Sequence, residues 1–156
     1  MKLTRTAALI LALAMVFALA GCGADKAEPI DTAALAGQLV EAASFGEPMN
    51  ALDSAVALGL YGAGEGVTVT AYAGTGATAE EAAVFDCGSA EAAEALKASL
   101  EQRNEVRISQ YADYDPEEVP KLENALIISG GQYVALLVAQ DQSGAAKIAT
   151  DALAKQ

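Results

Sequence analysis

The chain has 156 residues, with 9 basic and 21 acidic side chains, a net charge of −12, and neither histidine nor tryptophan. This excess of acid argues against binding to nucleic acid, which requires a basic surface. The absence of histidine excludes Ser-His-Asp and Cys-His catalysis and HExxH zinc sites.

The N-terminal residues have the pattern of a bacterial lipoprotein signal. Lys2 and Arg5 precede an apolar stretch at residues 7–20, which is shorter than the ~20 apolar residues of a membrane-spanning helix. Residues 19–22, Leu-Ala-Gly-Cys, resemble a lipobox, with small side chains where a signal peptidase cuts. The resemblance implies cleavage before Cys22 and a diacylglyceryl anchor on its thiol, with acyl chains such as palmitate. The alternative is an ordinary secretory signal that happens to contain a cysteine.

Three segments are therefore expected: a signal peptide over residues 1–21, a lipid-anchored tether over residues 22–30 and one domain over residues 31–156. The lipid would hold the domain on the extracytoplasmic side of the bacterial cell membrane. It would lie close to the bilayer, because an extended chain spans at most ~3.5 Å per residue. With Cys22 acylated, Cys87 has no partner for a disulfide, so packing alone must stabilise the fold.

The first predicted element of the domain is an amphipathic helix over residues 32–45. Asp31 is a suitable N-cap, and Leu35 and Leu39 recur on one face at helical spacing. Gly46 ends the helix.

Residues 50–66 fit two structures. They suit either a short helix ended by Gly62 and Gly64 or a strand over residues 55–61, and we favour the helix.

Two strands are predicted next. Residues 67–72 alternate in a β-rich pattern, a glycine turn follows at residues 74–76, and residues 80–86 form the second strand. Residues 78–81 also resemble a capping box that begins a helix, but the β-rich neighbour and the early Gly88 favour the strand. Its buried residues should be Ala82, Val84 and Phe85.

The longest predicted helix covers about residues 90–109 and begins after Ser89 as the N-cap. Its apolar stripe consists of Ala93, Leu96 and Leu100. The next positions on that stripe are arginines.

A short helical turn follows this helix. Asp115 at the N-cap, Pro116 at N1 and Glu118 at N3 indicate its start. We expect Pro120 to limit it to little more than one turn.

The last elements are a hairpin and a helix. Residues 125–129 and 132–138 are β-rich and flank Gly130-Gly131, a pair that can take the positive φ of a two-residue turn. Ser143 should cap the final helix. The order of elements predicts an α+β fold in which one antiparallel sheet of about four strands, built from two hairpins, packs against the long helix and the terminal helices.

The second half of the chain resembles a known family. It is similar to an uncharacterised family of short bacterial lipoproteins described only as a domain of unknown function. The resemblance implies an extracytoplasmic location and one small domain after a tether, and it brings no catalytic residues. The resembling residues are Gly76–Phe85, Arg103, Tyr111–Ala125 and Gly131–Val134.

Arg103 and Arg107 are the candidate ligand-binding residues. They lie one helical turn apart, where a guanidinium can bind a carboxylate or phosphate through two hydrogen bonds. The alternative is an internal salt bridge to one of the many acidic residues. We expect Arg103 to be structural and to tie the long helix to residues 114–123.

Three other patterns in the sequence have simpler structural explanations. The carboxylates of residues 113–118 suggest a calcium site, but their spacing does not match that of an EF-hand loop. Helix capping by Asp115 and Glu118 explains them without a metal. Cys87 is either a thiol activated by the following helix or a small buried residue, and we favour burial. The glycines of residues 62–66 lack the Lys-Ser/Thr of a phosphate loop.

The sequence therefore predicts no cofactor, no metal and no catalytic residues. We expect a non-enzymatic interaction or accessory module of the cell envelope, in contact with the membrane through its lipid and with a possible envelope protein partner. The alternative is a lipoprotein that binds a small ligand or peptide.

Overall fold

The computed structural model describes residues 28–156, so the predicted signal peptide and Cys22 lie outside the described residues. Within this range, none of the helices combines the length and the apolar character needed to span a bilayer. The elements in chain order are α2 (Thr32–Ala42), β1 (Asn50–Ala51), α3 (Ser54–Tyr61), β2 (Thr68–Ala73), β3 (Glu81–Asp86), α4 (Ala90–Tyr114), the 3-10 helix η1 (Pro116–Glu118), α5 (Val119–Glu123), β4 (Leu126–Gly130), β5 (Tyr133–Val138) and α6 (Ser143–Leu153).

The strands form one antiparallel sheet in the order β1-β2-β3-β5-β4. The predicted α+β fold, with one antiparallel sheet and a long helix, is confirmed. The hairpins β2–β3 and β4–β5 join through the pairing of β3 with β5. The short strand β1, in which Asn50 pairs with Ala73, adds a fifth strand to the expected four.

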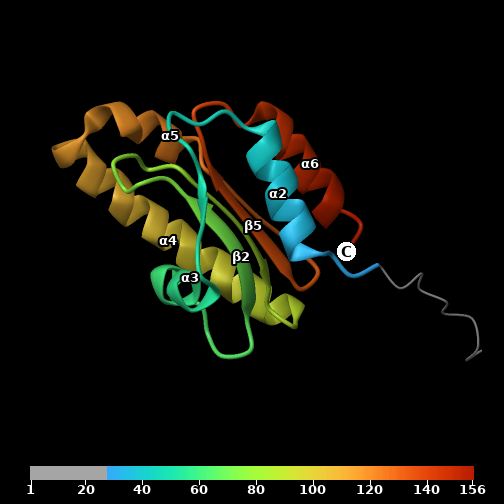
Figure 1. Cartoon of the computed structure of the whole chain (residues 1–156). Coiled ribbons are helices and arrows are strands. Elements are labelled where there is room, and N and C mark those ends of the chain that lie inside the picture. Colours follow the sequence, from blue (N-terminus) through green and yellow to red (C-terminus); the bar gives the residue numbers. More distant parts are fainter. Residues whose placement is uncertain (1–27) are drawn as a thin grey trace, which may run out of the picture.

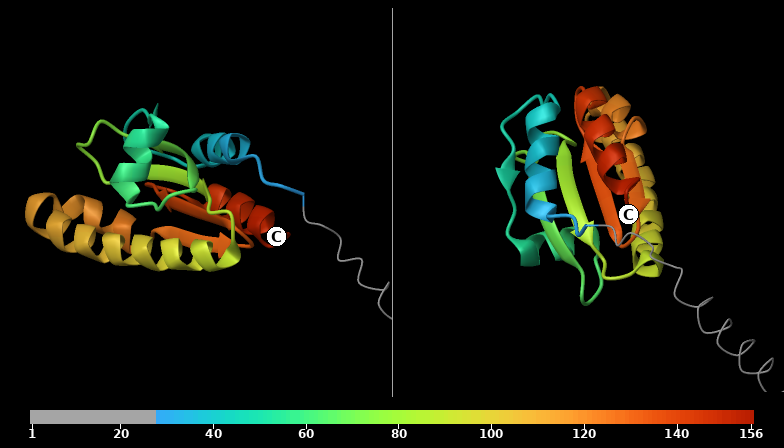
Figure 2. Two further views of the ribbon diagram at one scale, coloured as in Figure 1. Left: turned by 90° about the horizontal axis from the view of Figure 1, so that it is seen from below. Right: turned by 90° about the vertical axis from the view of Figure 1, so that its right-hand side faces the viewer.

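Helices cover both faces of the sheet (Figures 1 and 2). Ala83 and Phe85 of β3 face α3 and α4, whereas Ala82 and Val84 face α2 and α6. The predicted burial of Ala82, Val84 and Phe85 is confirmed, and β5 is buried along its whole length. The continuous apolar run of β5 reflects this position, because both its faces contact helices.

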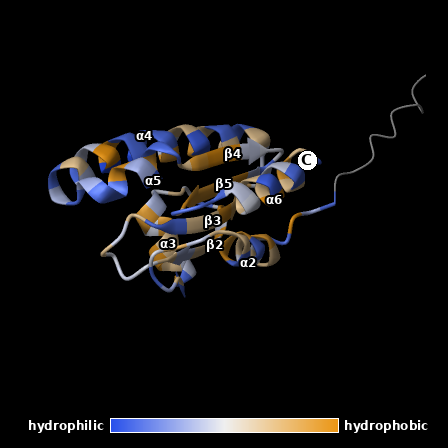
Figure 3. Ribbon diagram, turned by 90° about the horizontal axis from the view of Figure 1, so that it is seen from above, coloured by the Kyte–Doolittle hydropathy of each residue, from blue (hydrophilic) through white to orange (hydrophobic). Residues whose placement is uncertain are grey.

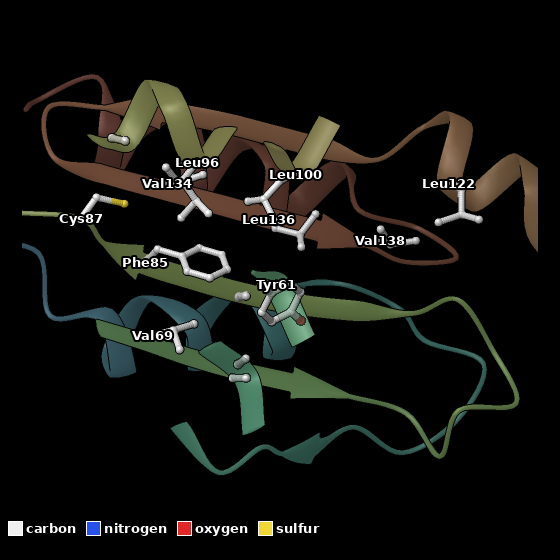
Figure 4. Close-up of a cluster of buried hydrophobic side chains, with 14 of the residues drawn as sticks. Tyr61, Val69, Phe85, Cys87, Leu96, Leu100, Leu122, Val134, Leu136 and Val138 are labelled. Atoms are coloured by element: carbon white, nitrogen blue, oxygen red, sulfur yellow. The ribbon is translucent and has the colours of Figure 1, made fainter. Parts of the chain in front are cut away.

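The larger core cluster lies between the sheet, α3 and α4. Figure 4 shows Phe85, Val134 and Leu136 pointing into the same space as Leu96 and Leu100 of α4. Tyr61 of α3 meets Phe85 edge to face, with ring centroids 5.2 Å apart. Such pairs add about 0.5–1.5 kcal/mol beyond the area that they bury.

Helix α4 is longer than predicted. Ser89 caps it and Ala93, Leu96 and Leu100 are buried, as expected. The helix continues to Tyr114 because its last turns still contact the core through Ile108 and Tyr111. Figure 3, coloured by residue hydropathy, shows hydrophilic residues along much of the α4 ribbon.

The helices α2 and α3 begin at aspartate N-caps. The Asp31 carboxylate accepts from two backbone N–H groups, as predicted, but α2 ends at Ala42 with Ala43 as its C-cap, so the predicted end at residue 45 and Gly46 is wrong. Residues 50–66 contain the favoured helix, α3, which Asp53 caps and Gly62 ends with φ +63°. Only glycine takes that conformation readily.

The turn between β4 and β5 is shifted by one residue from the prediction. Gly130 pairs with Tyr133 at the end of the ladder, so Gly131 and Gln132 form the loop, and of the two glycines only Gly131 has a positive φ. Gly130 has a different role. A Cβ there would lie 2.3 Å from the Leu153 carbonyl oxygen, so only glycine lets α6 approach β4 this closely.

Two further predicted helix boundaries are wrong. Pro120 does not end the turn that Asp115 begins, because it lies in the first turn of α5, where its missing N–H is not needed. Ser143 does not cap α6 but begins it, and the Asp141 carboxylate accepts from the Ser143 N–H and hydroxyl groups instead.

The strand register separates two ends of the sheet. At the proximal end, where the described chain begins, the Ile30 N–H donates to the Tyr133 hydroxyl and Tyr133 pairs with Asp86. At the distal end, Glu81 pairs with Val138. Since a strand rises about 3.4 Å per residue, Glu81 lies about 17 Å from Asp86.

Candidate functional site

A cluster of buried charges lies at the distal end of the sheet, between α3 and α4. Glu81 is the first residue of β3 and points to the same face as Ala83 and Phe85, toward α4. Arg103 and Arg107 lie on α4 one and two turns beyond the buried Leu100. Helical periodicity therefore brings both guanidinium groups to the start of β3.

The Glu81 carboxylate binds both arginines. Arg103 Nη1 and Nη2 donate to Glu81 Oε1 and Oε2 at 2.8 and 3.2 Å, and Arg107 Nη1 donates to Oε1 at 2.5 Å. The Glu81 side chain is 4% exposed, and those of Arg103 and Arg107 are 21% and 15% exposed. The two parallel bonds between Arg103 and Glu81 have the fork-to-fork geometry that makes the strongest carboxylate–arginine pairs, whereas Arg107 donates one bond to Glu81.

Two tyrosines and a backbone carbonyl complete the surroundings of the arginines. Arg103 lies over the Tyr61 ring at 4.9 Å, and Arg107 lies 5.8 Å from the Tyr111 ring centroid and donates to the Ala79 carbonyl oxygen at 2.9 Å. Burial and the nearby Glu81 charge raise the pKa of Tyr61, so its phenol stays protonated. The Tyr61 hydroxyl is buried and has no hydrogen-bond partner among the described residues.

A second group of charges adjoins the first through the backbone of residues 78–81. Lys121 Nζ contacts Glu118 Oε1 at 2.7 Å and Glu80 Oε1 at 3.0 Å. The two carboxylates also accept from backbone N–H groups. Gly46 donates to both Glu80 oxygens, and Ala79 donates to Glu118 Oε2. The two groups together, named here the charge cluster, contain three carboxylates and three cations.

The charge cluster borders an open cavity of about 300 Å³, named here the arginine cleft. Its lining residues come from α3, from α4 and from the start of β3, and include Leu60, Thr78, Glu80, Glu81, Arg103, Arg107 and Tyr111. A shallower groove along α4 shares both arginines and adds Val106. The chemistry available there is hydrogen bonding by guanidinium groups beside apolar surface.

The sequence identified the arginines but not the partner of Arg103. The predicted tie from Arg103 to residues 114–123 is wrong, because Arg103 binds Glu81 of β3. The neighbouring Asn104 makes that tie, through its side-chain amide and the Leu122 carbonyl oxygen at 2.8 Å.

The buried carboxylates were missed. Glu80, Glu81 and Glu118 are all buried, and Glu118 does not cap a helix as predicted but binds Ala79 and Lys121. Asp115 does cap, through the Glu117 N–H. The sequence does contain one indication of their burial. Glu80 and Glu81 stand at the start of an otherwise apolar strand, and a carboxylate that is buried there needs a cation or hydrogen-bond donor as its partner.

Among residues 28–156, no group of three or more acidic or cysteine side chains is arranged to hold a metal ion. Cys87 is buried at the end of β3, as favoured. Burial and the neighbouring Asp86 charge raise the pKa of its thiol to about 11. The thiolate is the reactive form of cysteine, so Cys87 is a poor nucleophile at neutral pH.

Residues 65–139 match the family model described as a domain of unknown function, DUF4358. These residues include all six members of the charge cluster, whereas Tyr61 and Leu60 precede them. No curated protein and no solved structure matched the chain.

Proposed function

We propose that this chain, which carries a domain of the DUF4358 family over residues 65–139, is a non-enzymatic binding module held at the extracytoplasmic face of a bacterial membrane by a lipid on Cys22. The support for the anchor is the sequence pattern of residues 1–22, with its basic start, apolar stretch and Leu-Ala-Gly-Cys ending.

The position of the charge cluster carries the proposal. The described chain begins at the proximal end of the sheet, and the short tether would hold this end near the bilayer. The charge cluster and the last turns of α4 lie at the opposite end. An anchored domain in this orientation presents the arginine cleft away from the membrane, where a partner in the envelope can reach it.

Apolar side chains beside the cleft support a binding role. Leu60 on α3 and Val106 on α4 are 46% and 53% exposed, although both are large and apolar. Interfaces commonly combine such apolar groups with arginine and tyrosine. The arginine cleft has all three.

The anchor is tested by labelling cells with an alkyne fatty acid. Label on the wild-type chain, and its loss in Cys22→Ala, is the expected result. The matched control is Cys87→Ala, which should keep the label. Equal labelling of the wild type and Cys22→Ala would overturn the anchor.

The binding role is tested by site-specific photo-crosslinking in native membranes. A photoreactive residue at Leu60 or Val106 should capture a recurrent envelope protein, identified by mass spectrometry. The control places the photoreactive residue at Lys155, which is exposed and lies near the proximal end, and this variant should not capture the protein. Recurrent failure at both Leu60, in the cleft, and Val106, in the adjoining groove, would refute a protein partner for this face.

A second candidate, a small-ligand or peptide-binding lipoprotein, is favoured by one observation. Arg103 and Arg107 share the single carboxylate of Glu81 and line an open cavity, where their remaining N–H groups are available to an anionic ligand.

A further inference from the structure

We infer that the arginine cleft binds the carboxylate of a ligand with a short apolar body, through the guanidinium groups of Arg103 and Arg107. The inference rests on the second candidate function above and names its ligand class. It does not depend on the lipid anchor.

The first support is the charge ratio of the ion pairs. In the described residues, Lys97 pairs with Glu101 and Lys147 pairs with Asp151, one to one, and Lys121 lies between two carboxylates. Only at Glu81 do two cations share one carboxylate in this part of the chain. Glu80 also lines the cleft, but it accepts from Gly46 and contacts Lys121, so both guanidinium groups have Glu81 as their shared carboxylate.

The second support is the number of unused donors. A guanidinium has five N–H donors. The hydrogen bonds of the described residues use two on Arg103, both to Glu81, and two on Arg107, to Glu81 and to the Ala79 carbonyl oxygen. Both side chains are mostly buried and line the cleft, so we expect a ligand oxygen in the cleft to accept from the N–H groups that the described residues leave unused.

The third support is the shape and polarity of the cleft. Its volume of about 300 Å³ lies at the lower end of ligand sites. Leu60 and Tyr111 offer apolar surface to the body of the ligand, and the groove that continues past Val106 leaves room for a longer chain. A free carboxylic acid and the carboxyl terminus of a peptide both fit this chemistry.

The other carboxylates near the cleft already have donors. Glu80 accepts from Gly46 and contacts Lys121, and Glu47 accepts from the hydroxyl groups of Thr75 and Thr78. These contacts offset the repulsion that Glu80 and Glu47 would exert on an anion.

The test is isothermal titration calorimetry of the full chain in detergent. N-acetyl-leucine should bind, and N-acetyl-leucinamide, which lacks the carboxylate, should bind at least tenfold more weakly. A hexapeptide with a C-terminal leucine is then compared in its free-acid and amidated forms. If the peptide acid binds more tightly than N-acetyl-leucine, the ligand is a peptide terminus. If both acids bind equally, the ligand is a free acid.

The variants separate binding from folding. Arg107→Gln should weaken binding of the acid at least tenfold, and Leu60→Ser, at a half-exposed position, should weaken it severalfold with an unchanged melting curve. Lys97→Gln, on the same helix but away from the cleft, should bind as the wild type does. Equal binding of acid and amide, or no binding of the acid at about 10 mM, well above a Kd of ~1 mM, would refute the inference. Photo-crosslinking to a protein partner would be unaffected by that result.

Discussion

Glu81 accepts hydrogen bonds from both terminal nitrogens of Arg103, at 2.8 and 3.2 Å, and so joins the first residue of β3 to the middle of α4. The two residues are 22 positions apart in the sequence. This pair fixes the long helix over the sheet at the same point where the arginine cleft opens.

Replacing Glu81 with Gln should destabilise the domain strongly. The change leaves two largely buried guanidinium groups without their shared carboxylate, and removing one partner of a buried pair costs about 3–5 kcal/mol. Urea unfolding followed by circular dichroism measures the loss. The control is Glu101→Gln, which breaks the exposed pair with Lys97 and should cost at most about 0.5 kcal/mol. Equal effects of the two variants would contradict a structural role for Glu81.

Replacing Arg103 with Ala should lower the melting temperature less than Glu81→Gln does. The variant loses the paired hydrogen bonds and the contact with the Tyr61 ring, but Arg107 still neutralises Glu81. A double-mutant cycle with Glu81→Gln should give a coupling energy of about 0.5–3 kcal/mol, as is typical of contacting residues. Simple additivity of the two changes would argue against the pairing.

Substitution of two glycines by alanine should have opposite effects. In Gly130→Ala the new methyl group would lie 2.3 Å from the Leu153 carbonyl oxygen, so α6 has to shift, at a cost of about 1–3 kcal/mol. In Gly37→Ala, inside α2, the methyl group meets nothing within 4 Å and should stabilise by about 0.5–1 kcal/mol through helix propensity. Denaturant midpoints of both variants check the signs. A neutral Gly130→Ala would mean that β4 and α6 are less closely packed than described.

Cys87 should resist alkylation until high pH. Burial and the Asp86 charge raise the pKa of its thiol to about 11, so the native thiol stays protonated at neutral pH. Mass-spectrometric mapping after iodoacetamide treatment should find Cys87 unmodified at pH 8 and modified in urea.

The same pKa predicts how stability depends on pH. In the unfolded chain the thiol ionises near pH 8.5, whereas in the folded protein it stays protonated up to about pH 11. The contribution of the protonated Cys87 thiol to the free energy of unfolding is therefore complete below pH ~8.5. It is lost as the pH rises from there through 11, because the unfolded chain ionises first. The difference in the free energy of unfolding between the wild type and Cys87→Ala, measured at each pH, separates this loss from the titration of lysines and tyrosines. A flat difference over this range would contradict the raised pKa.

Much of the fold could be predicted because its signals are local. The N-caps Asp31 and Ser89, the alternation along β2 and the apolar run of β5 each lie within one element, and the structure contains those elements. The predicted position of the hairpin turn is wrong by one residue. Gly130 lies in the strand because it packs closely against Leu153, which is distant in the sequence.

The candidate site was predictable only in part, for the same reason. The helical stripe Leu96–Leu100–Arg103–Arg107 places both arginines on the inner side of α4, and this follows from periodicity alone. Their partner does not follow from it, because many acidic residues could have met them. The pairing of β3 with β5 and the packing of α4 against the sheet select Glu81.

By itself, the sequence determined the secondary structure of most segments, the acidic balance and the lipobox pattern, since these depend on neighbouring residues and on composition. Only the tertiary structure decided that helices cover both faces of the sheet, that three glutamates are buried and that two arginines share one of them. The physical reason is that a buried charge is stabilised by whichever partner packing brings within hydrogen-bond distance, and that choice is made across the fold.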